Sequence, residues 1–392
     1  MNVLLSRRVR PTRVALLLVA FSVSVCVGHA QAPADAAAAP APDTLVFANG
    51  DQLTGKLLRA TGGTISFHSD VAGDLDIPVA KVKELRSSGS FAVLKKDQNV
   101  VGALVRPSAV HIEDGKLVST SGPQTVDTIP VGDIGYIVDE PTFRRETNPH
   151  PSFLYGWNGS IAAGATLVRS TQRDTTLTTA ISLVRTIPTV TYLPARNRTT
   201  VDLSETYGTS RSPGAIPQTV PTTPDSNVKT SIFHADAEQD EYISHRLYYF
   251  GGLAFDHNYS QGLDWQQIYG GGLGYTVFST PKQQLDLKAD LHYERQNFFI
   301  SSNNTQLVGS IFAENYRRNL PGKIVFTEIG NYIPSWNDPS AYSANITGAL
   351  ALPLFKRFAA SVSATDNYLN NPSLGYQKNS FLFVTGVAYS LK

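Results

Sequence analysis

One strip of this sequence, QQLDLKADLHYERQNFF at residues 283–299, alternates apolar and polar side chains without interruption from Leu285 to Glu294. Apolar side chains stand at every odd position from Leu285 to Tyr293, and polar or charged ones at every even position from Asp286 to Glu294. A period of two predicts a β-strand, because successive side chains of a strand point to opposite faces. Soluble strands are usually about 5–6 residues long. This longer strand therefore needs an apolar medium on one side and tolerates many charges on the other.

The first thirty residues predict export. Four arginines precede an apolar run at residues 14–28, and Gly28 and Ala30 are small residues at a cleavage position. The run is short of the roughly 20 residues that a spanning helix needs, so we predict a signal peptide at residues 1–30. Cys26 offers a lipoprotein site as the alternative, but the residue before such a cysteine is normally very small, and here it is Val25.

Composition excludes several classes of function. Loss of residues 1–30 takes the formal net charge from +1 to −3, because that segment holds four arginines and no acid. No basic stripe argues for nucleic acid. Cys26 is the single cysteine, so the mature chain has no disulfide, thiol catalyst or cysteine-bound metal. After an Ala/Pro-rich linker at residues 31–42, no stretch of about 18 apolar residues occurs, so any membrane insertion must use strands.

The chain from residue 43 onward predicts short strands joined by tight turns. Asn49 and Gly50 lie between two apolar runs and favour a β-hairpin, because both residues tolerate positive φ. The acidic residues Asp70, Asp74 and Asp76 could bind calcium. Their spacing lacks the Asp-x-Asp-x-Asp-Gly pattern of calcium loops, so we expect a solvated turn instead.

An internal repeat divides this region. LDIPVAKVKEL around Pro78 matches DTIPVGDIGYI around Pro130, and Gly55 matches Gly102. We predict two small tandem all-β modules, at residues 43–90 and 91–140. Each buries little surface alone, so we expect them to pack on each other.

Beyond a linker at residues 141–152, the period-two alternation becomes persistent. Residues 153–168, FLYGWNGSIAAGATLV, place Trp157, Ile161 and Leu167 on one face. Most candidate strands are near the roughly 9–11 residues that cross a bilayer at a tilt. We count about twelve, the first within 153–168 and the others at 175–186, 196–208, 228–238, 244–256, 266–278, 284–297, 306–316, 323–333, 340–352, 355–369 and 377–391.

The connections between these strands alternate in length. The longest, at residues 209–227 and 257–265, are odd-numbered connections, whereas even-numbered ones such as 279–283 and 353–354 are short. Long outer loops that alternate with short inner turns are typical of an outer-membrane β-barrel. We therefore predict an all-β chain whose residues 153–392 form a transmembrane antiparallel barrel of about 12 strands, with leucines toward lipid and charges toward a lumen.

The glycine run at residues 269–275, YGGGLGY, resembles a phosphate-binding loop at first sight. It lies in the middle of a strand pattern with no helix behind it. We therefore expect sharp bending or close packing in a barrel wall rather than a nucleotide site.

Several of these motifs also carry a family resemblance. They are the pair Tyr248-Tyr249, the turn at Asp256, the strand GGLGY at residues 271–275, the alternating strand after it, and the opening strand GWNGSIAAGATLV. Together they resemble the domain-of-unknown-function family 481, whose members are often labelled salt-induced outer-membrane proteins. The resemblance covers most of residues 153–392 and implies an outer-membrane β-barrel with no established activity.

The chain departs from that family pattern at two places. Members often have Gly-Asn after the first strand, where this chain has STQR at residues 170–173. Barrel proteins tend to end on an aromatic residue, whereas this sequence ends YSLK at residues 389–392.

The alternation of odd and even positions along the predicted strands places a set of mostly charged residues toward the predicted lumen. His234 shares a face with Asp236 and Glu238, and His292 lies between two carboxylates in the same way, so each could form a general base or a metal site. We favour a lumen whose charges satisfy one another, because barrel interiors are normally polar and no serine motif accompanies either histidine. We predict no enzyme, metal or cofactor. The candidate lumen-lining residues are Arg246, Asp286, Lys288, Asp290, His292, Glu294, His234, Asp236 and Glu238.

Three classes of function stay open. The barrel could be a small passive pore, an envelope anchor with a filled lumen whose modules at residues 43–140 bind a periplasmic partner, or, less favoured, an enzyme. A soluble secreted β-protein is the rival fold. We favour the pore, because so many inward charges are hard to satisfy without water. The expected partners are outer-membrane lipid, the barrel assembly machinery and a periplasmic protein, with no nucleic acid.

Overall fold

The computed structural model of the chain describes residues 41–96, 105–120, 126–148, 150–169, 173–212 and 226–391. The signal peptide and lipoprotein alternative predicted at residues 1–30 lie outside the described residues, as do most of the linker at 31–42 and most of the connection at 209–227. Gly102 of the repeat lies outside them as well. In the described part of the chain, no helix is long and apolar enough to cross a membrane.

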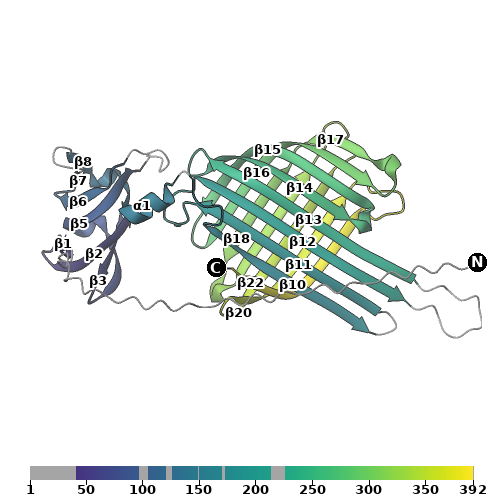
Figure 1. Cartoon of the computed structure of the whole chain (residues 1–392), viewed down its shortest axis with the longest axis horizontal. Coiled ribbons are helices and arrows are strands. Elements are labelled where there is room, and N and C mark those ends of the chain that lie inside the picture. The colour runs from purple at the N-terminus through teal and green to yellow at the C-terminus, as the bar shows by residue number, and fades with distance from the viewer. Residues whose placement is uncertain are drawn as a thin grey trace, which may run out of the picture. The chain divides into compact units, whose positions relative to one another are not determined.

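Nine short strands form one antiparallel sheet ahead of the barrel (Figure 1, purple to blue). Its order is β4-β3-β2-β1-β5-β6-β7-β8, and β9 pairs with both β2 and β5, so part of the sheet closes on itself. The strands are β1 (Asp43–Phe47), β2 (Gln52–Thr61), β3 (Thr64–Ser69), β4 (Gly73–Pro78), β5 (Val82–Lys95), β6 (Ser108–Glu113), β7 (Lys116–Thr120), β8 (Val126–Pro130) and β9 (Ile134–Asp139).

One hydrophobic core serves both halves of this sheet. Leu45 and Leu57 from the first half pack in the same buried cluster as Ile112 and Leu117 from the second. The strand β5 runs through the predicted module boundary at residue 90 and pairs with strands of both halves. The two repeat units therefore share a sheet and a core, which is how two units too small to fold alone can bury enough apolar surface.

The sequence repeat is visible as a structural repeat. The strands β4 and β8 both end on a proline, Pro78 and Pro130, and each proline leads into a single 3-10 turn, Val79–Lys81 or Val131–Asp133. The proline ring fixes φ near −65° and removes a backbone donor, which favours the end of a strand. The same arrangement of a proline and a three-residue turn thus redirects the chain once in each half.

Twelve strands close into an antiparallel barrel, which confirms the predicted fold class. The short strands β17 and β18 pair with successive parts of β16 and together form one interrupted strand. The ring closes between β10 and β22. The strands are β10 (Trp157–Arg169), β11 (Arg173–Ile187), β12 (Asn197–Ser212), β13 (Ser226–Tyr242), β14 (Leu247–Asn258), β15 (Leu263–Ser279), β16 (Gln283–Phe298), β17 (Thr305–Gly309), β18 (Phe312–Asn319), β19 (Val325–Ile333), β20 (Ser343–Phe355), β21 (Phe358–Leu369) and β22 (Asn379–Ser390).

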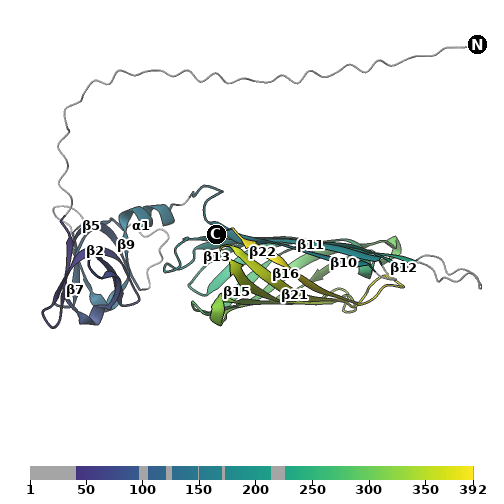
Figure 2. The same ribbon diagram turned by 90° about the horizontal axis from the view of Figure 1, so that it is seen from below.

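Side chains of the barrel alternate between an inward and an outward face. On β16, Asp286 and Asp290 are buried, whereas Leu287 and Leu291 are 45% and 60% exposed. Residues paired across strands share a face, so each inward residue of β16 marks a row of inward residues around the wall. The barrel is narrow in the view of Figure 2 and broad in that of Figure 1, so two opposed walls flatten it.

The two ends of the barrel differ. The first and last barrel strands start and finish at one end, here called the terminal end, which carries the short turns 243–246, 280–282 and 356–357. The opposite end, here called the loop end, carries the connections 334–342 and 370–378. The long connection predicted at 257–265 is shorter than expected, because β14 and β15 continue into it and leave a single 3-10 turn.

A short helix, α1 (Glu140–Glu146), joins the nine-stranded sheet to the barrel segment. Its last residue, Glu146, is 1% exposed, and its Oε2 accepts a hydrogen bond of 2.7 Å from the backbone N–H of Thr189 in the β11–β12 connection. Burial raises the pKa of the Glu146 carboxyl, but the bonds from Thr189, Arg145 and Tyr155 outweigh it and hold the pKa below its usual value.

The Glu146 contact should weaken in acid. A carboxyl whose pKa is lower in the folded chain stabilises it above the unfolded pKa of about 4.3 and loses that contribution as pH falls. We expect the melting temperature of the full chain to fall as pH drops from about 5 to about 3, and Glu146→Gln to lower it at pH 7 and reduce the response in that acid range. Asp70→Asn, on an exposed turn, is the control. An unchanged pH response in Glu146→Gln would contradict this assignment.

The facing of the strands can be tested with two apolar residues of opposite orientation. Leu291 points outward, whereas Ile329 on β19 lies in the inward row of Asp286 although it is 44% exposed. In a bilayer, arginine at Leu291 should impair insertion by about 2–4 kcal/mol, while arginine at Ile329 should be tolerated. Equal sensitivity in a vesicle-insertion titration would mean that the assigned facing is wrong.

Candidate functional site

The inward face of the wall formed by β12–β16 is strongly acidic. Eight carboxylates stand in its inward rows, whereas two permanent cations, Arg198 and Lys288, share that face among the described residues of these strands. The inward residues of β18–β22 are mostly uncharged, such as Asn331 and Thr365, with Arg317 near the terminal end as an exception. The carboxylates are Asp202, Asp236, Glu238, Asp240, Asp256, Asp286, Asp290 and Glu294.

Glycines remove side chains from the inward face of β14 and β15. A Cβ at Gly272 would lie 2.0 Å from the carbonyl oxygen of Ala289, and one at Gly274 would lie 2.2 Å from the ring of Tyr248. The run YGGGLGY therefore serves close packing in the wall, as predicted. Because Gly270, Gly272 and Gly274 of β15 present no inward side chains, the inward Tyr248 ring of β14 packs against Gly274, and side chains from β12, β13 and β16 can meet over this strip.

Two ion-pair groups span this glycine strip. Lys288 on β16 pairs with Glu238 on β13. Arg198 on β12 donates to Asp240 on β13 at 2.6 Å and to Asp286 on β16 at 2.9 Å, and its guanidinium carbon lies 5.2 Å from the ring centre of Tyr248. All three charged side chains of the Arg198 group are nearly buried. The ion pairs connect β12 and β13 to β16 across the glycines of β15.

Arg198, not Arg246, is the buried arginine of this network. Arg246 was expected in the lumen, but it lies in the exposed β13–β14 turn, where its carbonyl oxygen accepts a bond from Thr276. Parity along the strand NRTTVDLSE already places Arg198 and Asp202 on one face, so the alternation of β12 carried a usable signal. The other predicted residues stand on the inward faces of β13 and β16.

Each histidine of the set lies between two carboxylates. His234 contacts Asp256 at 2.6 Å through Nδ1 and Asp236 at 3.0 Å through Nε2, and its side chain is 43% exposed to the lumen. His292 contacts Asp290 at 3.0 Å and Glu294 at 3.7 Å, and its side chain is almost fully buried. The first group is therefore open to solvent and the second is closed.

The acidic residues do not converge as metal ligands. Among the described residues, no group of three or more His, Cys, Asp or Glu side chains could hold a metal ion. In the nine-stranded sheet, Asp74 contacts His68 at 2.6 Å and Asp76 accepts a bond from Ser66 at 2.6 Å, so these two predicted turn acids have separate neighbours.

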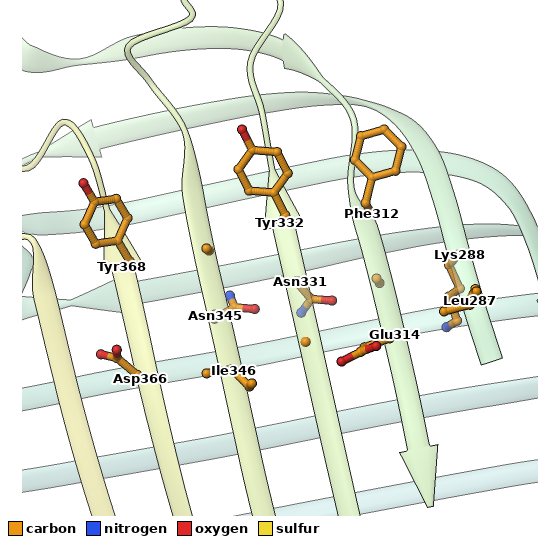
Figure 3. Close-up of a pocket in the computed structure, with 13 residues that line it drawn as sticks. Leu287, Lys288, Phe312, Glu314, Asn331, Tyr332, Asn345, Ile346, Asp366 and Tyr368 are labelled. Atoms are coloured by element: carbon orange, nitrogen blue, oxygen red, sulfur yellow. The ribbon is translucent and has the colours of Figure 1, made fainter. Parts of the chain in front are cut away.

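A groove of about 590 Å³ crosses the outward face of β16–β21. Figure 3 shows Phe312, Tyr332 and Tyr368 in one row above it, and Glu314 and Asp366 at opposite ends of the row below. The register places both rows on the outward side, because Glu314 and Asp366 belong to the row of Leu287. Most of the lining of the groove therefore belongs to the outward side, and the inward residues Lys288, Asn331 and Asn345 line it as well.

The chain matches the model of a protein family described as "Protein of unknown function, DUF481" over residues 161–391. The chain belongs to this family. The resemblance seen in the sequence is thereby confirmed, and the match begins inside β10 and ends just beyond β22, so DUF481 corresponds to the barrel. None of the curated proteins compared with the chain matches it.

Solved structures resemble the chain only distantly. The β domain of the Bordetella autotransporter BrkA has 10% identity and a TM-score of 0.31, and the match covers 60% of this chain and 98% of that one. The translocator domain of the autotransporter NalP from Neisseria meningitidis has 9% identity and a TM-score of 0.29, with 59% and 86% covered. The CymD monoaromatic hydrocarbon channel has 9% identity and a TM-score of 0.27, with 77% and 86% covered.

The two arginines provide a matched test of the network. Arg198→Gln removes the cation that Asp240 and Asp286 share and should destabilise the barrel by about 3–5 kcal/mol, because it leaves buried carboxylates unpaired. Arg246→Gln changes an exposed turn and should leave stability unchanged. The urea concentration that abolishes the folded, heat-modifiable gel band measures both. Similar midpoints for the two variants would rule out a structural role for the Arg198 network.

Proposed function

We propose that this DUF481 chain is an outer-membrane barrel that acts as a small, cation-preferring passive pore. The observation that carries the proposal is the acidic inward face of β12–β16, which opposes a nearly uncharged wall. Fixed carboxylates in a narrow, low-dielectric passage attract cations and repel anions. The loop end would face the exterior, and the terminal end with the nine-stranded sheet would face the periplasm.

The outward face supports insertion in a membrane. Leu253, Leu273 and Leu291 lie on adjacent strands and are 41%, 56% and 60% exposed. In water, such a band of exposed leucines would favour association with other molecules, because large apolar patches mark interaction surfaces. In a membrane, the same leucines would contact the hydrocarbon chains of the lipid. Outer-membrane lipid and the barrel assembly machinery are the partners that this location requires, and export by the signal peptide at residues 1–30 would deliver the chain.

The inward face supports a water-filled lumen. The side chains of Asp236 and Asp256 are 29% and 27% exposed although both point inward. On the opposite wall, inward residues such as Ser363 and Thr365 are small and uncharged. Charged side chains that remain accessible inside a barrel are stabilised by water, because burial without water would be costly.

An envelope anchor is the second candidate. The contact between Glu146 and Thr189 ties α1 to a terminal-end connection, and Phe143 of α1 packs in one cluster with Leu193 of the same connection. An anchored sheet at the periplasmic side could hold a periplasmic protein through residues 43–140. A barrel that inserts but never conducts in any variant would favour this function over the pore.

We propose no catalytic role for the two histidines. The side chain of His292 is almost fully buried, so a substrate could not reach it. Both ring nitrogens of His234 already contact carboxylates, which suits an ion-lined lumen as well as a general base.

The cation preference can be measured directly. We expect the refolded chain in planar bilayers to conduct with a reversal potential that favours K⁺ over Cl⁻ in a KCl gradient. The double variant Asp236→Asn, Asp256→Asn should reduce the permeability ratio by roughly two-fold or more, because it removes two accessible inward charges. These residues are preferred to Asp286, which is enclosed by the Arg198 pair.

Glu205→Gln is the matched control. Glu205 lies on the same wall, but its row pairs with Phe233 on the outward face, so the change should leave selectivity unaltered. Anion preference in the unmodified chain, or equal shifts in the control and the double variant, would refute the assignment of the acidic face to a conducting lumen.

A further inference from the structure

The loop end of the barrel is crossed by a contact between opposite walls. The β14–β15 connection meets the end of β21 and the start of β22, with four strands between them on either side of the ring. The side chain of Gln261 in that connection donates from Nε2 to the carbonyl oxygens of Asn367 at 3.0 Å and Lys378 at 2.9 Å. One amide group thus joins two walls across the lumen.

Apolar packing reinforces this contact. Leu263 from β15, Phe298 from β16 and Leu369 from β21 form a buried cluster, each less than 5% exposed. Gly262 has a φ of +72°, and a Cβ there would lie 2.9 Å from the Cβ of Ser373 in the β21–β22 connection. Only a residue without a side chain permits this approach, so the backbone of Gly262 lies against the side chains of Ser373 and Tyr376.

The turn that presents Gln261 is itself held in shape. Asn258 donates from Nδ2 to the Oε1 of Gln261 at 2.8 Å, and its own Oδ1 accepts a bond of 3.0 Å from the backbone of Ser260. Gln261 therefore reaches the far wall with both ends of its amide bonded. Residues 258–263 are a short rigid segment, called the latch below.

We propose that the latch is the gate of the pore: contact between residues 258–263 and the β21–β22 end closes the loop end, and its separation opens the lumen. This inference rests on the proposed pore. The contact is small enough to reverse, since it comprises the two hydrogen bonds of Gln261, a 3.4 Å bond from Asn371 to Gln296, the packing of Gly262 and one three-residue apolar cluster. Between the two walls, the buried Oδ1 of Asn371 and Oγ of Ser373 have no hydrogen-bond partner among the described residues, and opening would bring water to them.

Two substitutions should open the gate. We expect Gln261→Ala and Leu369→Ala in the full chain to raise the fraction of time spent conducting in planar bilayers at least ten-fold, without changing the ion preference set by the inward acids. Gln267→Ala is the control, because Gln267 lies on β15 in an outward row with Phe255 and Arg295. The heat-dependent gel shift shows whether each variant has folded.

A disulfide should hold the gate shut. The mature chain has no cysteine, so Gly262→Cys with Ser373→Cys introduces a single pair. Their Cβ positions need only a small shift to reach the 3.5–4.5 Å of a disulfide. We expect the oxidised pair to be silent and a reductant to restore conduction.

The outcomes separate the gate from the pore. Conduction that is equal in the unmodified chain, in Gln261→Ala and in the oxidised pair would overturn the latch and leave the pore standing. Folded Gln261→Ala and Leu369→Ala variants that never conduct would overturn both. Frequent opening in these two variants, with silence only in the oxidised pair, would establish the latch.

Discussion

The barrel depends on charged side chains that meet over a stretch of β15 without inward side chains. Lys288 reaches Glu238, and Arg198 reaches Asp286, across a strip where Gly270, Gly272 and Gly274 face the lumen. Without the glycines, the inward space would be filled and the pairs could not form. Without the pairs, the glycine strip would have little to hold its curvature.

The strand β16 of this wall contributes side chains to contacts at both ends of the barrel. At the terminal end, β16 contributes Asp286 to the Arg198 group, and at the loop end it contributes Phe298 to the apolar cluster beneath the latch. The middle of β16 holds His292 between carboxylates. A single strand of alternating sequence thus carries a polar network, a closed histidine group and a hydrophobic contact in succession.

The architecture was predictable because strand facing is a local property of the sequence. The alternation at Leu285–Tyr293 already separated the outward and inward faces, and the proline repeat at Pro78 and Pro130 marked equivalent turns. The network was not predictable, because the contact of Arg198 with a residue 88 positions later depends on register and on the glycine strip. Arg246 was misplaced for a related reason, since its strand begins at Leu247, three residues after the predicted start at residue 244.

A flattened barrel has two unequal dimensions, and in the proposed pore the narrower one would limit passage. In a round pore, adding strands widens the opening in every direction, whereas here extra strands would lengthen the slit and leave the separation of the walls unchanged. The distance between the two walls depends on how closely they can approach each other over the glycines of β15. A solute would therefore be selected by its thinnest section, so that a flat ring and a compact ion of equal mass would meet very different barriers.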